Sequence, residues 1–600
     1  MTSGRMIESA LDLKAVKRWT ERLHSFERRC SHSDFTAAAK YCAEALAEAG
    51  FENIELLEHR ADGRTAAFDC AMPPAWDLRG RSLLRIAGEE TILADTDATP
   101  FAAAPWSAPT PPGGITAELA AVRPGEMPDV RGKWVLLLIG DGRNPSGEYL
   151  NRLRENGAVG VAAADLMTGR DYPDAVKWFN GIGRFGWYPV AGDVGLPLFS
   201  ISARNAMMLS RRLEAGETIS LHGAMNTETY EGGIYTVTAV IPGRSELEYA
   251  LFSHIYEPFA GDNSVGFGVC CGIGQFVRRV CGTPEKTLRV VFSMELYGLA
   301  AYLSDPERSG RIAGALNMDA LNHRKQRSLK FVRSPLCAPW FGDWVLPRVL
   351  ERETGHDGFA EVSGTLGDDT FPGDPLCGGV PVNWCLNPSG TAHHCGCADF
   401  EPDWDWAERE VPGVAAAVLE MLQFDAVGCA AFPALAEREF SEESRKICAK
   451  NIPCDEKHRL LKALLDSLDG RLASAEKYCG VALDRTALIR AYRNADAGVG
   501  GENVFSPAEQ AASAVVPIRL KATPFSMIDI PREVRKSLRV SRLLYALFDG
   551  ERTLLEAIRL ADWAQGQRTD DEAIRREAEL LKYFERYGYI KLRPAAVAEA

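Results

Sequence analysis

Four residues of metal-ligand or acid–base type follow one another along the sequence, each beside a segment that should position it. His254, Glu295 and Asp319 each come directly after an apolar, β-prone run, and Asp262 opens a hydrophobic stretch. An imidazole and two carboxylates can hold a divalent cation such as zinc, and a further carboxylate can act as a general base. These residues therefore predict a metal site with a base beside it. Taken alone, this stretch is better explained as an ordinary strand-to-helix turn capped by Asp262, and the later residues reverse that order.

A second cluster lies on a loop after residues 380–386, which read as a strand. There His393 and His394 are adjacent, and Cys395 follows them. Paired histidines flanked by cysteine are typical of metal-binding loops, and a thiolate is itself a competent zinc ligand. The sequence leaves open which of the three would bind. A cysteine nucleophile beside His394 is less favoured, because no strand-to-helix turn presents the thiol.

The elements that must position these side chains alternate between strands and helices over residues 230–425. Such alternation predicts an α/β fold with a mixed, mainly parallel sheet and helices on both faces. The carboxyl ends of parallel strands meet at one edge of a sheet, and sites form there in such folds. His254, Glu295 and Asp319 all fall at expected strand ends. We therefore expect the three side chains to meet.

The composition is that of a globular protein and argues against several functions. The chain has 600 residues, 46% hydrophobic and 25% charged, with a formal net charge of −14. That charge argues against nonspecific nucleic-acid binding, which requires a basic surface. No run of about 18 apolar residues could cross a membrane, and the start lacks the apolar core of a signal peptide. With 15 cysteines, an odd number, we expect a cytoplasmic protein with reduced thiols.

A chain of 600 residues exceeds what one hydrophobic core accommodates, so we expect several parts. Changes in composition and periodicity along the sequence divide it into five segments. Pro and Gly are dense around residues 100–114, within a segment that interrupts the sheet pattern. Residues 437–500 look helical, and residues 526–592 read as three helices and a strand. The catalytic domain is expected to begin with residues 1–78 and to continue, with the metal site, over 229–428, on either side of an insert at 79–228. A helical linker region at 429–525 and a C-terminal module at 526–600 follow.

The order of the polar residues resembles that of the zinc aminopeptidase and glutaminyl cyclase family. The matching motifs are Asp-Asn-x-x-Gly at 262–266, Gly298-Leu299 after Glu295, and Asn-x-Asp ending at Asp319. The resemblance covers nearly the whole chain and implies a zinc exopeptidase-like fold. It implies that Glu295 is the general base and that the metal ligands come from His254, Asp262, Asp319, His394 and His393, with Cys395 as an alternative ligand.

Two further segments resemble modules that accompany such enzymes. Residues 79–228 resemble the protease-associated (PA) domain, a lid in many exopeptidases, through Gly-Lys at 132–133, Gly-Ala-x-Gly at 157–160 and the Pro-containing strand at 196–202. A generic α/β insert is the alternative. Residues 526–600 resemble a winged helix. Few basic residues cluster on its third helix, so we expect it to dock a protein or peptide rather than DNA.

Three departures from the family pattern affect the metal site. The family's His-x-Asp is His254-Ile-Tyr256 here, so the acid that orients the histidine is missing. The second glutamate of the family's pair is Leu296, which cannot bind a metal. His394 fits the distal position only with one extra loop residue, which keeps Cys395 in consideration. We therefore expect one tightly bound zinc and a second that is weak or absent.

The leading hypothesis is a zinc-dependent, aminopeptidase-like hydrolase that cleaves a peptide or related amide through a zinc-bound water with Glu295 as base. Asp368 and Asp369 could hold the substrate's free α-amino group, or could belong to an ordinary solvated loop. Two alternatives stay open. One is a binding or scaffold protein on a degenerate peptidase fold. The other is a pathway-specific processing enzyme whose C-terminal module docks a peptide or carrier. The sequence also leaves open the substrate, the metal's identity and a homo-oligomer.

Overall fold

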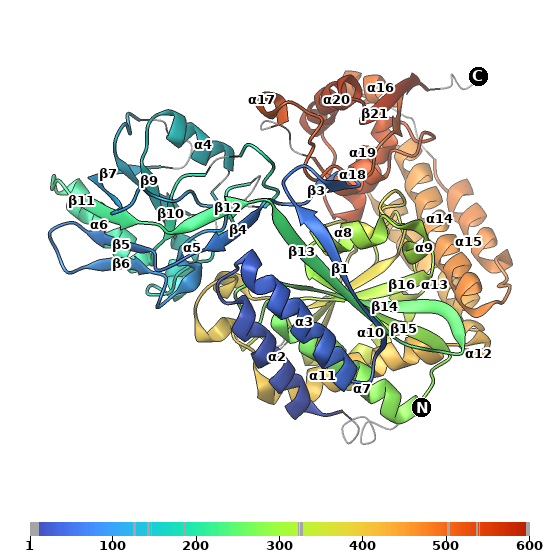
Figure 1. The fold of residues 1–600 in the computed structure, drawn as a ribbon. Helices are drawn as coiled ribbons and strands as arrows, with labels where there is room; N and C mark the ends of the chain where they lie inside the picture. The colour runs from blue at the N-terminus through green and yellow to red at the C-terminus, as the bar shows by residue number, and fades with distance from the viewer. Residues whose placement is uncertain are drawn as a thin grey trace.

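The computed structural model contains two large sheets and a helical C-terminal part (Figure 1). The expected absence of a signal peptide concerns the first ten residues, which lie outside the described residues. The structure describes residues 11–595 except 124, 125, 127, 141–143, 146, 184–186, 194, 322, 325–327, 501–504, 536, 537 and 539.

The larger sheet has eight strands in the order β1-β13-β15-β14-β16-β19-β17-β18. Strands β15, β14, β16 and β19 run parallel at its centre, and β13 and β1 extend one edge antiparallel. The central strands are buried along most of their length, which is why they read as continuous apolar runs. The bounds are β1 Glu52–Ala61, β13 Gly232–Ile241, β14 Ser245–Ile255, β15 Lys286–Met294, β16 Ile312–Met318, β17 Leu329–Val332, β18 Phe359–Val362 and β19 Val382–Leu386.

Helices cover both faces of this sheet. Phe292 of β15 packs on Phe267 of α7, with ring centroids 4.9 Å apart. The next residue, Ser293, faces Gly298 of α8, where an added Cβ would lie 2.5 Å from the Ser293 Cβ. Because successive strand residues point to opposite faces, α7 and α8 lie on opposite sides, and the predicted fold class is confirmed. The helices around this sheet are α2 Leu13–Glu27, α3 His32–Glu48, α7 Ser264–Cys281, α8 Tyr297–Leu303, α9 Pro306–Ser309, α10 Gly342–Thr354 and α11 Trp404–Gln423.

The second sheet has seven strands in the order β10-β9-β8-β7-β11-β5-β6 and lies beside the main body, on the left in Figure 1. It falls within the insert expected over residues 79–228, and the antiparallel pair β4–β12 lies at the two ends of that segment. Its assignment as a PA domain stays a prediction. The bounds are β4 Ala75–Leu78, β5 Leu83–Ile86, β6 Ile92–Asp95, β7 Ile115–Val122, β8 Trp134–Ile139, α4 Gly147–Glu155, β9 Gly160–Asp165, α5 Leu166–Asp171, β10 Leu198–Ser200, α6 Ala203–Glu214, β11 Ser220–Ala224 and β12 Thr227–Tyr230.

The C-terminal part is mainly helical and ends in β21, which pairs antiparallel with the earlier strand β20. Asp69, next to the small hairpin β2–β3 (Ala66–Ala67 and Cys70–Ala71), accepts hydrogen bonds from Met527 N and Tyr589 Oη, both at 2.8 Å. The module is thereby anchored on the main body, and its assignment as a winged helix stays a prediction. The bounds are α12 Ala426–Cys429, α13 Phe432–Ala449, α14 Cys454–Cys479, α15 Thr486–Ala497, α16 Pro507–Ser513, β20 Val515–Arg519, α17 Arg532–Arg535, α18 Arg542–Ala546, α19 Leu554–Ala564, α20 Asp571–Arg586 and β21 Ile590–Pro594.

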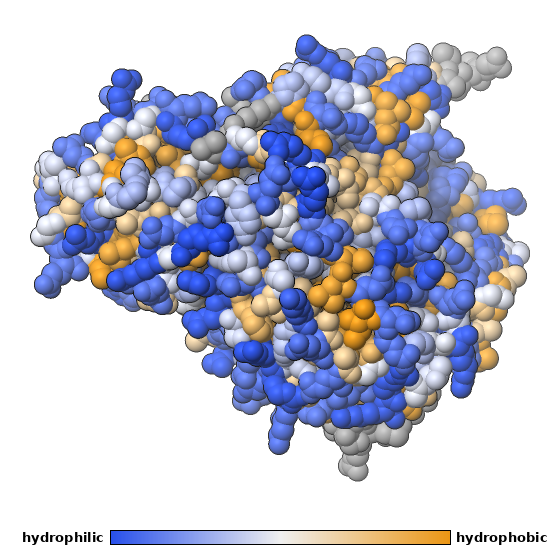
Figure 2. All heavy atoms as spheres, viewed as in Figure 1, coloured by the Kyte–Doolittle hydropathy of each residue, from blue (hydrophilic) through white to orange (hydrophobic). Residues whose placement is uncertain are grey.

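The face drawn in Figure 2 is largely hydrophilic, with apolar residues in scattered groups. Among the described residues, no single helix combines the length and apolarity that a membrane crossing requires. The bent pair formed by Trp404–Gln423 and Ala426–Ala449, at 99°, meets those criteria only when the two are taken together.

Candidate metal centre

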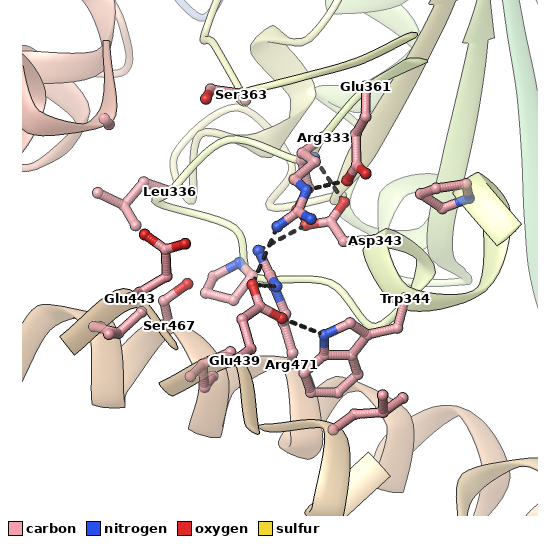
Figure 3. A pocket seen from close by; sticks show the side chains of 18 of the residues that line it. Arg333, Leu336, Asp343, Trp344, Glu361, Ser363, Glu439, Glu443, Ser467 and Arg471 are labelled. Carbon is pink, nitrogen blue, oxygen red and sulfur yellow. Dashed lines mark hydrogen bonds and ion pairs between the residues drawn. The ribbon is translucent and has the colours of Figure 1, made fainter. Parts of the chain in front are cut away.

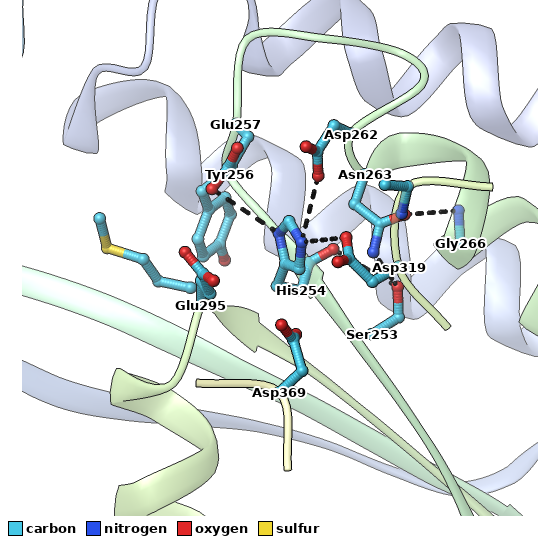
Figure 4. A network of polar contacts seen from close by, with 12 residues as sticks. Ser253, His254, Tyr256, Glu257, Asp262, Asn263, Gly266, Glu295, Asp319 and Asp369 are labelled. Atoms are coloured by element: carbon cyan, nitrogen blue, oxygen red, sulfur yellow. Dashed lines mark hydrogen bonds and ion pairs between the residues drawn. The ribbon is translucent and has the colours of Figure 1, made fainter. Parts of the chain in front are cut away.

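Three sequence-predicted residues meet at the carboxyl edge of the central strands. His254 ends β14, Asp319 directly follows β16, and Asp262 lies on the loop between β14 and α7. The Nε2 atom of His254 is 2.8 Å from Asp319 Oδ1 and 3.3 Å from Asp262 Oδ1 (Figure 4). All three side chains are buried, and their possible ligand atoms lie within 4.8 Å of one another. The structure thus brings together one imidazole and two carboxylates in a geometry that suits a divalent cation.

Asn263 fixes the loop that carries Asp262. Its amide Nδ2 donates to Ser253 Oγ at 3.0 Å and to the Met318 carbonyl at 2.8 Å, which ties the loop to the ends of β14 and β16. Its Oδ1 accepts from the N–H groups of Gly266 and Ala320, both at 3.2 Å, and so caps the start of α7. The Asp262–Asn263 peptide bond is cis. The Asp-Asn-x-x-Gly motif is therefore a clamp that fixes where Asp262 lies.

Gly266 is required by the same clamp. A Cβ at this position would come within 2.4 Å of Ser253 Oγ and 2.8 Å of the Met318 carbonyl oxygen. Any side chain would push α7 away from the strand ends, so the glycine reflects close packing.

The electrostatics of the three residues favour a bound cation. Burial alone would lower the pKa of His254, but Asp319 and Asp262 raise it well above its ordinary value. Burial and the neighbouring Asp262 raise the pKa of Asp319 to about 6. Burial would also raise the pKa of Asp262, yet the neighbouring His254 and His394 hold it well below the usual range. The place between Asp319 and Asp262 therefore favours positive charge, which a divalent ion would supply instead of the proton on His254.

The second predicted cluster approaches Asp262 from its other side. His394 Nε2 is 3.1 Å from Asp262 Oδ2, and Trp178 N donates to the His394 carbonyl at 2.7 Å. The ring of His393 stacks on that of His394, with centroids 3.8 Å apart, and the two histidines and Asp262 form a second group of possible ligands. Cys395 is buried but belongs to neither ligand group found among the described residues.

Glu295, the predicted base, directly follows β15 and lines the same cavity. Trp187, from the insert, donates its indole N–H to Glu295 Oε2 at 2.5 Å. Burial and the nearby Glu257 carboxylate raise the pKa of Glu295 well above its ordinary value. The next residue, Leu296, is buried at the start of α8 and offers no ligand atom.

Asp368 and Asp369 also line the cavity, but they differ in their partners. Asp368 forms an ion pair with Arg542 and accepts a hydrogen bond from Tyr188 Oη at 2.6 Å. Asp369 accepts from Asn317 Nδ2 at 2.9 Å, and burial followed by the charge of Asp319 raises its pKa well above the usual value. The charge of Asp368 is therefore already balanced by Arg542, whereas Asp369 faces other carboxylates.

The cavity has a volume of about 440 Å³ and draws its lining from three parts of the chain. Glu257 comes from the main domain, Lys177, Trp187 and Tyr188 from the insert, and Arg542 from the C-terminal part. The sequence analysis missed all five. Only Glu257 carried a local signal, as an acid three residues after a histidine at a strand end.

A larger hollow, of about 690 Å³, lies between the main domain and the helices α13 and α14 (Figure 3). Its central charges satisfy one another. Glu439 accepts from Arg471 at 2.9 Å and from Arg333 at 3.1 Å, and Arg471 pairs with Asp343 at 3.3 Å. This mutual pairing ties the main domain to α13 and α14.

No family model matches the sequence, and no curated protein matches it. The structure is similar to solved structures. A peptidase M28 precursor from Shewanella amazonensis matches with a TM-score of 0.52 at 17% identity, over 70% of this chain and 95% of that one. A zinc aminopeptidase from Bacillus subtilis matches with 0.50 at 16% identity, over 69% and 96%. Identities this low establish the fold alone, and the predicted zinc exopeptidase-like fold is confirmed.

Proposed function

We propose that this chain, which shares its fold with zinc aminopeptidases, is a metal-dependent hydrolase of the aminopeptidase type that cleaves a peptide or a related amide. The observation that carries the proposal is the convergence of His254, Asp262 and Asp319 around one cavity with Glu295. Fold likeness alone would not suffice, because one fold hosts many functions.

The donor set fits zinc. Ligand atoms bound at 2.0–2.2 Å in a tetrahedron lie about 3.4 Å apart, and the separations from His254 Nε2 are 2.8 and 3.3 Å. Asp262 Oδ1 is also buried without a hydrogen-bond partner among the described residues, which is unusual unless an ion satisfies it. A cation bound here would polarise the scissile carbonyl and lower the pKa of water.

Glu295 then performs the proton transfers. It accepts a proton from the attacking water and passes it to the leaving amine. The Trp187 N–H, donated to Oε2, orients the carboxylate and favours its ionised form. Its buried setting and the Glu257 charge make the protonated form easy to hold after the first transfer. Both states are needed in one catalytic cycle.

Asp369 supports an exopeptidase rather than an endopeptidase. The free α-amino group of a substrate is a cation, and a half-buried carboxylate among other acids offers it a charge-assisted hydrogen bond. Asp368 suits this role less well, because Arg542 and Tyr188 already bind it. We therefore assign recognition of the amino group mainly to Asp369.

The test is hydrolysis of a panel of aminoacyl anilides and short peptides by the purified protein. We expect release of N-terminal residues, loss of activity on chelation and its return with Zn²⁺. Glu295→Gln should lower kcat at least a hundredfold while keeping the metal content, because Glu295 is not a ligand. N-acetylated substrates serve as the control and should resist cleavage. Activity that survives both chelation and Glu295→Gln would contradict the proposal. A protein that binds no divalent ion and cleaves nothing would favour the alternative, a binding or scaffold protein on a degenerate peptidase fold.

A further inference from the structure

Glu257 lies beside the metal centre, and the function proposed above uses only its charge, which acts on Glu295. It is 2% exposed, and its Oε2 is 3.4 Å from His394 Nε2. The same nitrogen is 3.1 Å from Asp262 Oδ2. In Figure 4, Glu257 and Asp262 lie on the same side of His254. Two carboxylate oxygens thus lie within 3.4 Å of one imidazole nitrogen, and the Asp262 oxygen among them is not the one that faces His254.

The buried carboxylate of Glu257 is not satisfied by hydrogen bonds. Its Oε2 has no hydrogen-bond partner among the residues that the structure describes. A buried polar atom without a partner costs about 1–3 kcal/mol, and more when the group is charged. The neighbouring charge of Asp262 adds to the cost, since both burial and that charge raise the pKa of Glu257. An ion between the two carboxylates would remove both penalties.

The two separations from His394 suit tetrahedral coordination, and Glu257, which lies outside the groups of ligand atoms within 4.8 Å of one another, must turn toward Asp262 to complete it. Separations of 3.1 and 3.4 Å from His394 Nε2 are close to the spacing of about 3.4 Å expected between ligand atoms of one zinc ion. We infer that Glu257 is a protein ligand of a second divalent cation, which it holds together with His394 and Asp262. Asp262 then bridges the two ions through its two oxygens. This inference rests on the first site of the proposed function.

The inference changes the expected metal content. The sequence pattern favours one tight ion, because Leu296 stands where the resembling family has a second glutamate. Leu296 is buried and ligates nothing, but Glu257 approaches His394, beside Asp262, from the loop after β14. The chain therefore supplies the missing carboxylate from a different position, and we expect two ions per chain.

A role for Glu257 in orienting His254 is the main alternative. Glu257 Oε1 is 3.9 Å from His254 Nδ1, beyond hydrogen-bond distance. The two roles predict different losses. A ligand takes one ion with it when removed, whereas an orienting residue lowers affinity at the first site about 10–100-fold and leaves the number of ions unchanged.

The experiment is elemental analysis of the full chain after saturation with Zn²⁺ and removal of the excess. Wild type should hold two ions per chain, and Glu257→Gln, His394→Asn and the double variant should each hold one. Glu27→Gln is the matched control. Glu27 is equally buried under the same loop, but its carboxylate already accepts hydrogen bonds from Tyr256 N and Ser264 Oγ, both at 2.6 Å. The Glu27→Gln variant should therefore hold two zinc ions.

Calorimetric titration with Zn²⁺ provides a second readout, in which the variants should lose one binding event and keep the other. Two ions in Glu257→Gln, or one in Glu27→Gln, would overturn the inference. A wild type that holds one ion and cleaves substrates would overturn it while leaving the proposed function intact. A wild type that holds none would refute both.

Discussion

Asp262 is the residue on which both groups of ligands depend. One of its oxygens faces His254 at 3.3 Å and the other faces His394 at 3.1 Å. The substrate side of the cavity depends similarly on Asp369, whose carboxylate has a hydrogen bond from Asn317 and, unlike Asp368, is not paired with Arg542. Single side chains with these positions allow sharp tests.

Asp369→Asn should raise KM more than it lowers kcat for substrates with a free α-amino group. A lost charge-assisted hydrogen bond of about 1.5–3 kcal/mol corresponds to a 10–150-fold loss in kcat/KM. Steady-state kinetics on an aminoacyl anilide series measures this. Asp368→Asn is the comparison and should have a smaller effect on KM, since Arg542 already binds Asp368. An equal effect of the two substitutions would contradict the assignment.

At the scale of elements, the end of β14, the end of β16 and the start of α7 are joined by one side chain. Asn263 makes four hydrogen bonds to these three elements. The carboxyl ends of parallel strands are held at fixed spacing by the sheet, but the loop that carries Asp262 is held only by such contacts.

Asn263→Ala should therefore lower both stability and metal affinity. We expect about 2–4 kcal/mol less free energy of unfolding and at least tenfold weaker zinc binding, from urea denaturation and calorimetry. Asp425→Ala is the control, because Asp425 caps α12 through Val427 N and Gly428 N, far from the site along the chain. It should cost about 1 kcal/mol and leave zinc affinity unchanged. Unchanged zinc affinity in Asn263→Ala would show that the clamp does not position Asp262.

The same elements show what a sequence can predict. Apolar β-prone runs marked the ends of β14, β15 and β16, so His254, Glu295 and Asp319 could be expected to meet. The loop side chains could not be oriented this way, and Glu257 was overlooked because a loop has no periodicity that fixes a direction. Nor does any local pattern record that Trp187 and Arg542, from two other parts of the chain, reach one cavity.

At the scale of the whole molecule, the cavity depends on three parts of the chain remaining packed. Arg542 of α18 pairs with Asp368 and donates to Tyr188 Oη at 2.5 Å, which joins the C-terminal part, the main domain and the insert. Removal of residues 526–600 would thus impair small substrates as well as large ones. Docking of a partner by this module stays a prediction.

His32 should make a contribution to the stability of the whole fold that is lost in acid. Burial lowers the pKa of His32 to about 4, from 6.5. Between these values the unfolded chain binds the proton and the folded one does not, so stability is lost as the pH falls through this window. The difference in unfolding free energy between wild type and His32→Asn should shrink by about 2 kcal/mol from pH 7.5 to pH 5. The pKa of His24 is also lowered to about 4, but His24 is present in both proteins, so its contribution to the pH dependence cancels in the difference. A difference that does not vary with pH would contradict the assignment.

The most direct test of the account is diffraction at the zinc absorption edge from crystals of the full chain grown with Zn²⁺. The account predicts an anomalous peak about 2.0–2.2 Å from His254 Nε2 and from carboxylate oxygens of Asp262 and Asp319, with Glu295 facing the ion across the cavity. A map in which zinc binds elsewhere, and no ion lies within reach of these three side chains, would contradict it.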